Sequence, residues 1–157
     1  MDYSIISKGY NELYKEEQLK KINLIKKYLN IKPTDKLLDI GAGTGISTNF
    51  FNCGCVGVEP CRLLLMQGKN IIEARAEKLP FKDKSFNIIL SLTSIHHFDL
   101  KKSIKEIKRV SKPNAKIIIS ILKRANKFNE IKKELLINFK LNKEIEEEKD
   151  FIYFLTL

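Results

Sequence analysis

A glycine-rich turn directly after a short apolar segment is the feature that most restricts how this chain can fold. Residues 36–40 read KLLDI, typical of a short buried strand, and Gly41, Gly43 and Gly45 follow at once. Glycine permits a tight turn and lets a ligand approach the backbone closely. Residues 46–51 then predict a helix, whose first N–H groups would be free to face a ligand. This order is typical of open α/β sheets, which bind ligands at the carboxyl ends of their strands.

The rest of the chain alternates between strand and helix patterns. Further strands are predicted over residues 56–58, 70–73, 86–92 and 116–122, and helices over 10–30, 62–67, 101–112 and 127–139. Segments 143–147 and 151–157 are joined by a short turn, which predicts an antiparallel pair. We therefore predict an α/β fold: a Rossmann-like open sheet, mostly parallel, with a C-terminal antiparallel hairpin strand. A single domain would span residues 1–157, with a helical lid over 1–30 and a core over 36–157.

Two carboxylates near the turn indicate what kind of ligand it holds. Glu59 ends the strand that follows and can accept hydrogen bonds from both hydroxyls of a ribose, which serves a dinucleotide as well as another nucleoside. The glycine spacing is G-x-G-x-G with Ile46 next, whereas the dinucleotide fingerprint is G-x-G-x-x-G. Asp39 lies two residues before the first glycine, where it would repel a pyrophosphate but suit an ammonium or sulfonium group. These features favour S-adenosylmethionine, and a nicotinamide-dependent oxidoreductase stays as an alternative.

Composition restricts the class of protein. Hydrophobic content of 43% and charged content of 31% are ordinary for a globular domain, and the longest apolar runs are too short to span a bilayer. The first residues lack the layout of a signal peptide, so we expect a cytoplasmic protein without a membrane partner. Cys53, Cys55 and Cys61 are an odd count that does not suggest a disulfide framework, and structural zinc needs four ligands. We therefore expect free thiols and no metal site.

The net charge of +10 raises the question of a nucleic-acid partner. Residues 81–125 hold 11 Lys and Arg against 3 Asp and Glu, and many of these cations fall within 101–112. Ile104, Ile107 and Val110 lie between them at helical spacing, so the favoured interpretation is the solvated face of an amphipathic helix. A patch that steers an anionic substrate, RNA included, is the alternative.

Five segments in order resemble the class I S-adenosylmethionine-dependent methyltransferases. The similarity is greatest to the type 11, small-molecule branch related to quinone-biosynthesis C-methyltransferases. It runs through residues 3–122 and more loosely to residue 157. The segments are LLDIGAGTG at 37–45, VEP at 58–60, AEKLPF at 76–81 with SFN at 85–87, SIHHF at 94–98, and KPNA at 112–115.

The resemblance implies a role for each matching position. The turn from Asp39 through Gly41, Ala42, Gly43, Thr44 and Gly45 would hold the methionine part of S-adenosylmethionine. Glu59, followed by Pro60, would hold the ribose hydroxyls, and Ala76 and Glu77 would border the adenine. Ser91, Leu92 and Thr93 would lie near the amino group and the sulfonium. Tyr10 would close over the cofactor, with a packed core aromatic as the alternative.

Departures from the family pattern bear on the acceptor. Arg75 stands where many relatives have an Asp that reads the adenine, and the insertion that covers the substrate after the fifth strand is missing. The alternative to an enzyme active by itself is a cofactor-binding subunit that needs a partner subunit, or a second copy in a homodimer, to complete its pocket. The sequence after the fourth strand, residues 91–94, lacks the Asn/Asp-Pro-Pro-Tyr motif of amino-methylating nucleic-acid enzymes. A small-molecule acceptor is therefore favoured, with tRNA or rRNA as the alternative.

His96 is the candidate general base, because histidine titrates near neutral pH. The alternative is that one of the adjacent His96 and His97 packs against or caps the following helix. Asp99 is a further candidate for that cap.

Overall fold

The computed structural model describes the backbone of residues 3–157 and the side chains of residues 12–157. The strands are β1 (Lys36–Ile40), β2 (Gly54–Glu59), β3 (Ile71–Glu73), β4 (Phe86–Leu92), β5 (Ser111–Leu122), β6 (Lys140–Glu146) and β7 (Asp150–Thr156). The helices are α1 (Tyr3–Tyr28), α2 (Arg62–Leu65), α3 (Leu100–Val110) and α4 (Phe128–Asn138), with a short 3-10 helix η1 (Ile95–His97).

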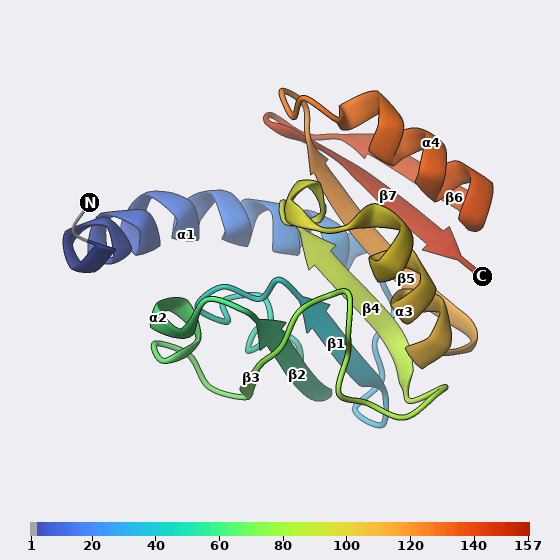
Figure 1. Ribbon diagram of the computed structural model, residues 1–157, viewed down its shortest axis with the longest axis horizontal. Helices are drawn as coiled ribbons and strands as arrows, with labels where there is room; N and C mark the ends of the chain where they lie inside the picture. The colour runs from blue at the N-terminus through green and yellow to red at the C-terminus, as the bar shows by residue number, and fades with distance from the viewer. Residues whose placement is uncertain (1–2) are drawn as a thin grey trace.

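The seven strands form one sheet in the order β3-β2-β1-β4-β5-β7-β6 (Figure 1). The first five strands in that order pair in parallel, and β7 runs antiparallel to both β5 and β6. The predicted Rossmann-like sheet with a C-terminal antiparallel hairpin is confirmed. The order reverses at β1, which has β2 on one side and β4 on the other, and such a reversal opens a crevice at the carboxyl ends of the strands.

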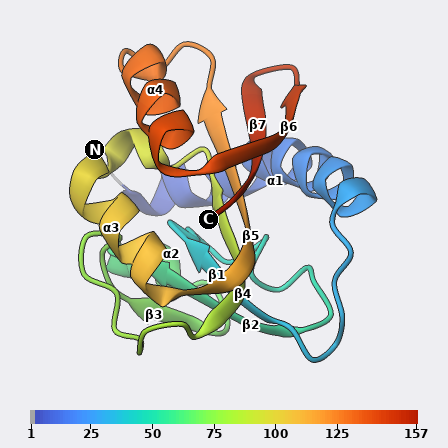
Figure 2. The ribbon, with the colours of Figure 1, turned by 90° about the vertical axis from the view of Figure 1, so that its right-hand side faces the viewer.

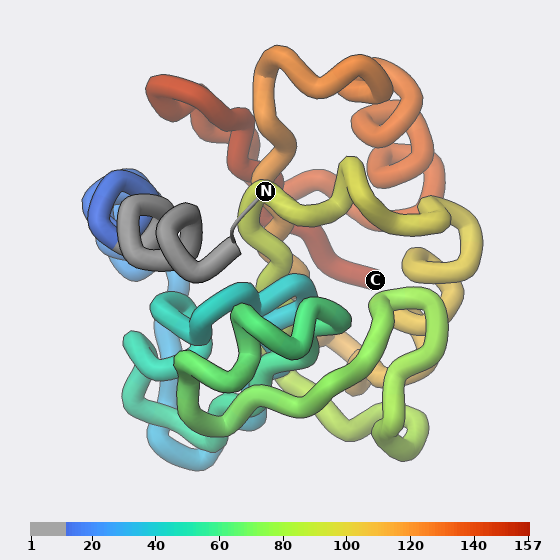
Figure 3. Tube along the Cα trace, turned by 60° about the vertical axis from the view of Figure 1, so that its left-hand side comes forward, coloured from blue at the N-terminus to red at the C-terminus, as the bar shows by residue number. Residues whose placement is uncertain are grey.

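Apolar side chains cover both faces of the sheet. On one face α1 packs Ile22, Ile25 and Leu29 against alternate residues of β1, β4 and β5. On the other face α3 and α4 cover the sheet (Figure 2, Figure 3), and their apolar side chains pack against the intervening residues. Burial on both faces explains the consecutive apolar residues at positions 88–90 of β4, and each fully buried Ile or Leu contributes about 1.5–3 kcal/mol.

The segment after the glycine turn differs from the prediction. Residues 46–51 form consecutive turns and not a helix, with one helix-like bond from Asn49 N to Gly45 O at 3.0 Å. The hydroxyls of Ser47 and Thr48 donate to the carboxylate of Asp39 at 2.5 and 2.8 Å. Side chains of this kind bond to groups outside the helix ladder and so weaken a short helix.

Element ends also differ from those predicted. β5 begins at Ser111, so the expected turn at Pro113 and Asn114 lies inside the strand, with Asn114 at φ +63° and a shift of register opposite Phe86 and Ile88. Asparagine tolerates this left-handed conformation, and the irregularity lets the strand continue. The first helix runs over Tyr3–Tyr28 rather than 10–30, and α2 is shorter than 62–67. In the part of the chain that the structure describes, no helix combines the length and apolarity needed to cross a membrane.

Candidate active site

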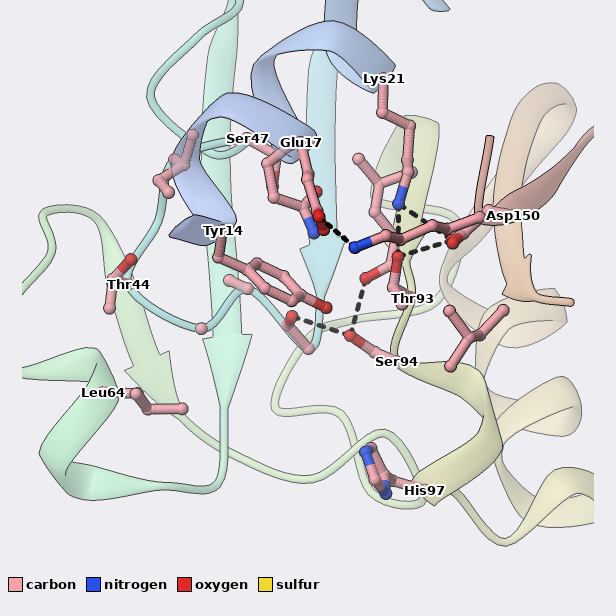
Figure 4. A pocket seen from close by; sticks show the side chains of 18 of the residues that line it. Tyr14, Glu17, Lys21, Thr44, Ser47, Leu64, Thr93, Ser94, His97 and Asp150 are labelled. Carbon is pink, nitrogen blue, oxygen red and sulfur yellow. Dashed lines mark hydrogen bonds and ion pairs between the residues drawn. The ribbon is translucent and has the colours of Figure 1, made fainter. Parts of the chain in front are cut away.

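A cavity of about 640 Å³ lies at the carboxyl ends of the central strands (Figure 4). This volume is within the range of roughly 300–1,000 Å³ that small-molecule sites occupy. Most of its wall comes from the glycine turn with Glu59, from the α1 residues between Leu13 and Lys21, from the β4–η1 connection, and from the end of β5 with the start of β7. Residues of the first helix and of the last strand thus meet at this cavity in the described structure.

The glycine turn shapes the floor of the cavity. Gly41 has φ +74°, and a Cβ there would lie 2.5 Å from the Cβ of Ser94, so only glycine fits between the turn and the end of β4. Gly43 has φ +58°, and a Cβ there would meet nothing within 4 Å, so this face of the backbone is open. Ligands can approach such an open backbone closely.

Glu59 stands beside the turn with both carboxylate oxygens fixed. Oε2 accepts a hydrogen bond from Gly43 N at 3.0 Å, and Oε1 accepts one from Cys61 N at 3.1 Å. The side chain lines the cavity, and each carboxylate oxygen has a second lone pair to offer. A pair of oriented acceptors at this position fits the two adjacent hydroxyls of a ribose.

Asp39 acts from behind the turn and does not line the cavity. It is buried, and its two hydroxyl donors are Ser47 and Thr48. Burial, with a smaller contribution from the charge of Glu59, raises the pKa of Asp39 to about 6, although the hydrogen bonds from Ser47 and Thr48 lower it. At neutral pH the two carboxylates place negative potential next to the turn, which suits a cationic ligand group.

The structure gathers only part of the predicted site on the cavity wall. Gly41, Ala42, Gly43, Thr44, Glu59, Leu92, Thr93 and His96 line it, whereas Asp39, Gly45, Pro60, Ala76, Glu77 and Ser91 do not. Glu77 accepts a hydrogen bond from Asp99 N at 2.7 Å and pairs with Arg75 at 3.4 Å. Ser91 is fully buried and its Oγ has no hydrogen-bond partner among the described residues. The cofactor contacts of all these residues stay predictions, and the side chain of Tyr10 lies outside the described residues.

His96 lines the cavity from η1, with its ring 4.0 Å from that of His97. Its Nδ1 is buried and has no hydrogen-bond partner in the described part of the chain. Burial lowers the pKa of His96, the neighbouring His97 lowers it further, and the charge of Asp150 opposes both. The imidazole is therefore neutral at physiological pH, the form that can accept a proton. The cap of α3 is Asp99, as predicted, which accepts from Lys102 N at 3.2 Å.

A buried polar cluster in the cavity wall was missed by the sequence analysis. Lys21 Nζ lies 2.9 Å from Asp150 Oδ2 and 2.6 Å from Thr93 Oγ1, and these side chains converge in Figure 4. Thr93 Oγ1 and Ser120 Oγ also donate to Asp150 Oδ2, at 2.6 and 2.9 Å. We call these four residues the Lys21–Asp150 cluster. No local pattern marks it, because its members come from α1, the end of β4, β5 and the start of β7.

The cysteines play no part in the cavity wall. Cys53, Cys55 and Cys61 are free thiols, with Cys53 and Cys55 sulfurs 3.2 Å apart at the start of β2. Among the described residues, no group of His, Cys, Asp and Glu side chains is arranged to hold a metal ion.

Comparison with known proteins places this geometry in a family. A family model described as a methyltransferase domain matches residues 38–119, just over half of the chain. An uncharacterised protein of Methanocaldococcus jannaschii, MJ1252, is 33% identical over 127 residues, which cover 76% of this chain and 49% of that protein. The uncharacterised methyltransferase YcgJ of Bacillus subtilis is 30% identical over 127 residues, covering 69% and 50%. The chain thus spans about half the length of these curated relatives.

Solved structures share the fold. The PH0226 protein of Pyrococcus horikoshii superposes with a TM-score of 0.76 at 19% identity, covering 91% of this chain and 90% of that one. A SAM-dependent methyltransferase from Aquifex aeolicus gives a TM-score of 0.72 at 19% identity, covering 99% and 98%. The family model matches the strands and the glycine turn that build the cavity, and the chain accordingly belongs to the class I S-adenosylmethionine-dependent methyltransferase family.

Proposed function

We propose that this protein transfers a methyl group from S-adenosylmethionine to a small-molecule acceptor. The observation that carries the proposal is the carboxylate of Glu59, which Gly43 N and Cys61 N orient at the wall of a cavity floored by an open glycine turn. This combination supports recognition of a ribose beside a flexible chain, as in a nucleoside-type cofactor.

Different residues of the cavity wall would hold different parts of the cofactor. Glu59 would hold the ribose, and the turn from Gly41 to Thr44 would hold the methionine part near the negative charges of Asp39 and Glu59. When bound, S-adenosylmethionine supplies an electrophilic methyl group on a positively charged sulfur. Holding donor and acceptor aligned lowers the barrier by up to about 7–11 kcal/mol in favourable cases, so no strong base is required.

His96 and α1 would complete the site. A neutral His96 on the cavity wall can accept the proton that an acceptor releases. The α1 residues that line the cavity, among them Leu13, Tyr14 and Gln18, would exclude water as the proposed lid. Tyr10 would extend that lid.

The acceptor is proposed to be small because part of the cationic face of α3 is engaged within the molecule. Arg109 pairs with Glu106 and Asp83, and Lys102 pairs with Asp99. RNA is the second candidate, since a relative named "Probable tRNA methyltransferase 9B" from Bos taurus is 31% identical over 99 residues. We also propose that a second copy in a homodimer, or a partner subunit, completes the cavity. The proposed location is the cytoplasm.

Calorimetric titration tests the cofactor assignment. S-adenosylmethionine and S-adenosylhomocysteine should bind, and NADH should not. Glu59→Ala should weaken both by roughly 30-fold or more, because it removes hydrogen bonds to a charged group. Glu73→Ala is the matched control, since Glu73 is the exposed register partner of Glu59 on β3 and does not line the cavity. NADH binding, or no loss in the Glu59 variant, would contradict the proposal.

A further inference from the structure

We infer that Asp150 selects the acceptor: its free carboxylate oxygen accepts a hydrogen bond from a hydroxyl or amine N–H of the acceptor molecule. The inference rests on the proposed function and adds a substrate class to it, a small molecule with an O–H or N–H donor on an apolar body.

The carboxylate of Asp150 is bonded on one side only. Lys21, Thr93 and Ser120 all contact Oδ2. Oδ1 accepts no hydrogen bond from the side chains or backbone of the described residues, although Asp150 is only 1% exposed. Asp150 lines the cavity, and Oδ1 is the carboxylate oxygen that its neighbours among the described residues leave for a ligand. A buried carboxylate oxygen without a donor is costly unless a ligand supplies one.

Asp150 lies on the side of the cavity away from Glu59. Asp150 begins β7 opposite Leu122 at the end of β5, whereas Glu59 ends β2. In the sheet order these strands are four spacings apart, or roughly 19 Å at about 4.8 Å per strand. The glycine turn lies between them. An acceptor would therefore meet Asp150 on the far side of the cofactor's methionine part, next to His96.

The Lys21–Asp150 cluster costs folding free energy that a purely structural contact would not require. Thr93 has φ +53°, a conformation that a β-branched residue rarely adopts and that Thr93 N stabilises by donating to Ser120 Oγ at 2.8 Å. Lys21 is only 4% exposed, and burying an ion pair gains little over apolar packing. Strain and buried charge together in a cavity wall are typical of a ligand-binding position.

The residues around Asp150 indicate the charge and polarity of the rest of the ligand. Lys21 neutralises the carboxylate, so the position does not call for a cationic group. Leu13, Tyr14 and Leu122 contribute apolar surface to the cavity wall, beside Arg124 and the Glu17–Lys149 ion pair. A neutral ligand with one hydroxyl or amine donor on an apolar ring suits both features.

Phenol and anisole are matched probes, because they share a ring and only phenol can donate. Their affinities for the protein saturated with S-adenosylhomocysteine would be measured by ligand-observed NMR. Phenol should bind about tenfold or more tightly than anisole. In Asp150→Asn the three donors should keep the amide oxygen at the Oδ2 position and turn the amide N–H toward the cavity, so the preference should vanish or reverse. Asp83→Asn makes the same change at an exposed carboxylate outside the cavity and should leave the preference intact.

A second variant allows for poor folding of Asp150→Asn. Lys21→Met combined with Asp150→Leu replaces the ion pair with apolar packing and should bind both probes equally. Equal binding in the natural protein, including no binding of either probe, would overturn the inference, as would a phenol preference retained by a folded variant. A tenfold loss of S-adenosylhomocysteine affinity in Asp150→Asn would assign Asp150 to the cofactor instead. If S-adenosylhomocysteine does not bind at all, the proposed function fails, and the same comparison on the free protein still tests Asp150.

Discussion

Behind the glycine turn, Asp39 is a buried carboxyl whose charge is held by the hydroxyls of Ser47 and Thr48. Its pKa of about 6 in the folded protein lies above the ordinary value of 3.8. The folded state therefore binds more protons than the unfolded state between these values, and stability falls as pH rises through this window. The residue thus reduces stability at neutral pH while it supplies charge beside the cavity.

We predict that Asp39→Asn is more stable than the natural protein at pH 7–8, by up to about 3 kcal/mol, the equivalent of the pKa difference. Its stability should change less between pH 4 and 6 because the titrating group is gone. Urea denaturation across this pH range measures both effects, with exposed Asp83→Asn as the control. Parallel pH profiles for the variant and the natural protein would contradict the assignment.

At His96 we predict a loss of turnover without a loss of cofactor. His96→Gln should lower methyl transfer by about 10²–10⁴-fold at neutral pH and leave the affinity for S-adenosylhomocysteine unchanged. Because burial lowers the pKa of His96, activity should reach its plateau at a lower pH than an ordinary histidine would give. A pH–rate profile with an identified acceptor is the measurement. His97→Gln is the matched comparison, since His97 lines the same cavity but is more exposed, and an equal effect there would refute the assignment of the base to His96.

Among the elements, α1 is held to the sheet in two ways. Its apolar side packs Ile22, Ile25 and Leu29 on the sheet, and its Lys21 reaches Asp150 of β7. Exposed Glu17 also pairs with Lys149 at the turn before β7. These contacts join the beginning of the chain to its end directly over the cavity.

Removing one partner of the buried pair should be costly. Lys21→Ala should lower the free energy of unfolding by about 3–5 kcal/mol, because it leaves Asp150 buried and unpaired. Lys102→Ala, which breaks an exposed pair with Asp99, should cost less than about 1 kcal/mol. Chemical denaturation compares the two. Similar small losses in both variants would mean that water replaces Lys21 without difficulty.

At the scale of the whole molecule, the net charge of +10 comes from an excess of Lys and Arg, some of which have partners within the protein and some of which do not. On the α3 face Lys108 donates to Asn138, and Arg109 is held by Glu106 and Asp83. Lys101, Lys105 and Lys112 have no ion pair among the residues that the structure describes. Free lysines of this kind give a salt-sensitive attraction to polyanions rather than recognition of one.

We predict that tRNA binds weakly and loses affinity steeply as salt rises to about 0.15 M. Exchanging Lys101, Lys105 and Lys112 for Glu should abolish that binding and leave methylation of a small acceptor unchanged. Fluorescence anisotropy over a salt series and a turnover assay are the two measurements. Tight tRNA binding at high salt, together with loss of turnover in the triple variant, would favour the RNA alternative.

Local patterns in the sequence determined much of the scaffold. β1 and β4 have the predicted bounds, because an apolar run between turn residues needs no knowledge of its neighbours. The glycine turn with Glu59 was also predictable, since steric freedom and charge act over short stretches of chain. The antiparallel hairpin followed from the short connection between its strands.

Only the tertiary structure decided which side chains meet at the cavity. Residues 46–51 lose their helix because Asp39 binds the hydroxyls of Ser47 and Thr48. The Lys21–Asp150 cluster joins residues 129 positions apart, and β7 inserts between β5 and β6 to bring it about. Such contacts depend on how the elements pack, because only burial makes a specific pair of a lysine and an aspartate that look ordinary in the sequence. Hydrophobic periodicity predicts single elements, and it does not predict which residues of distant elements come into contact.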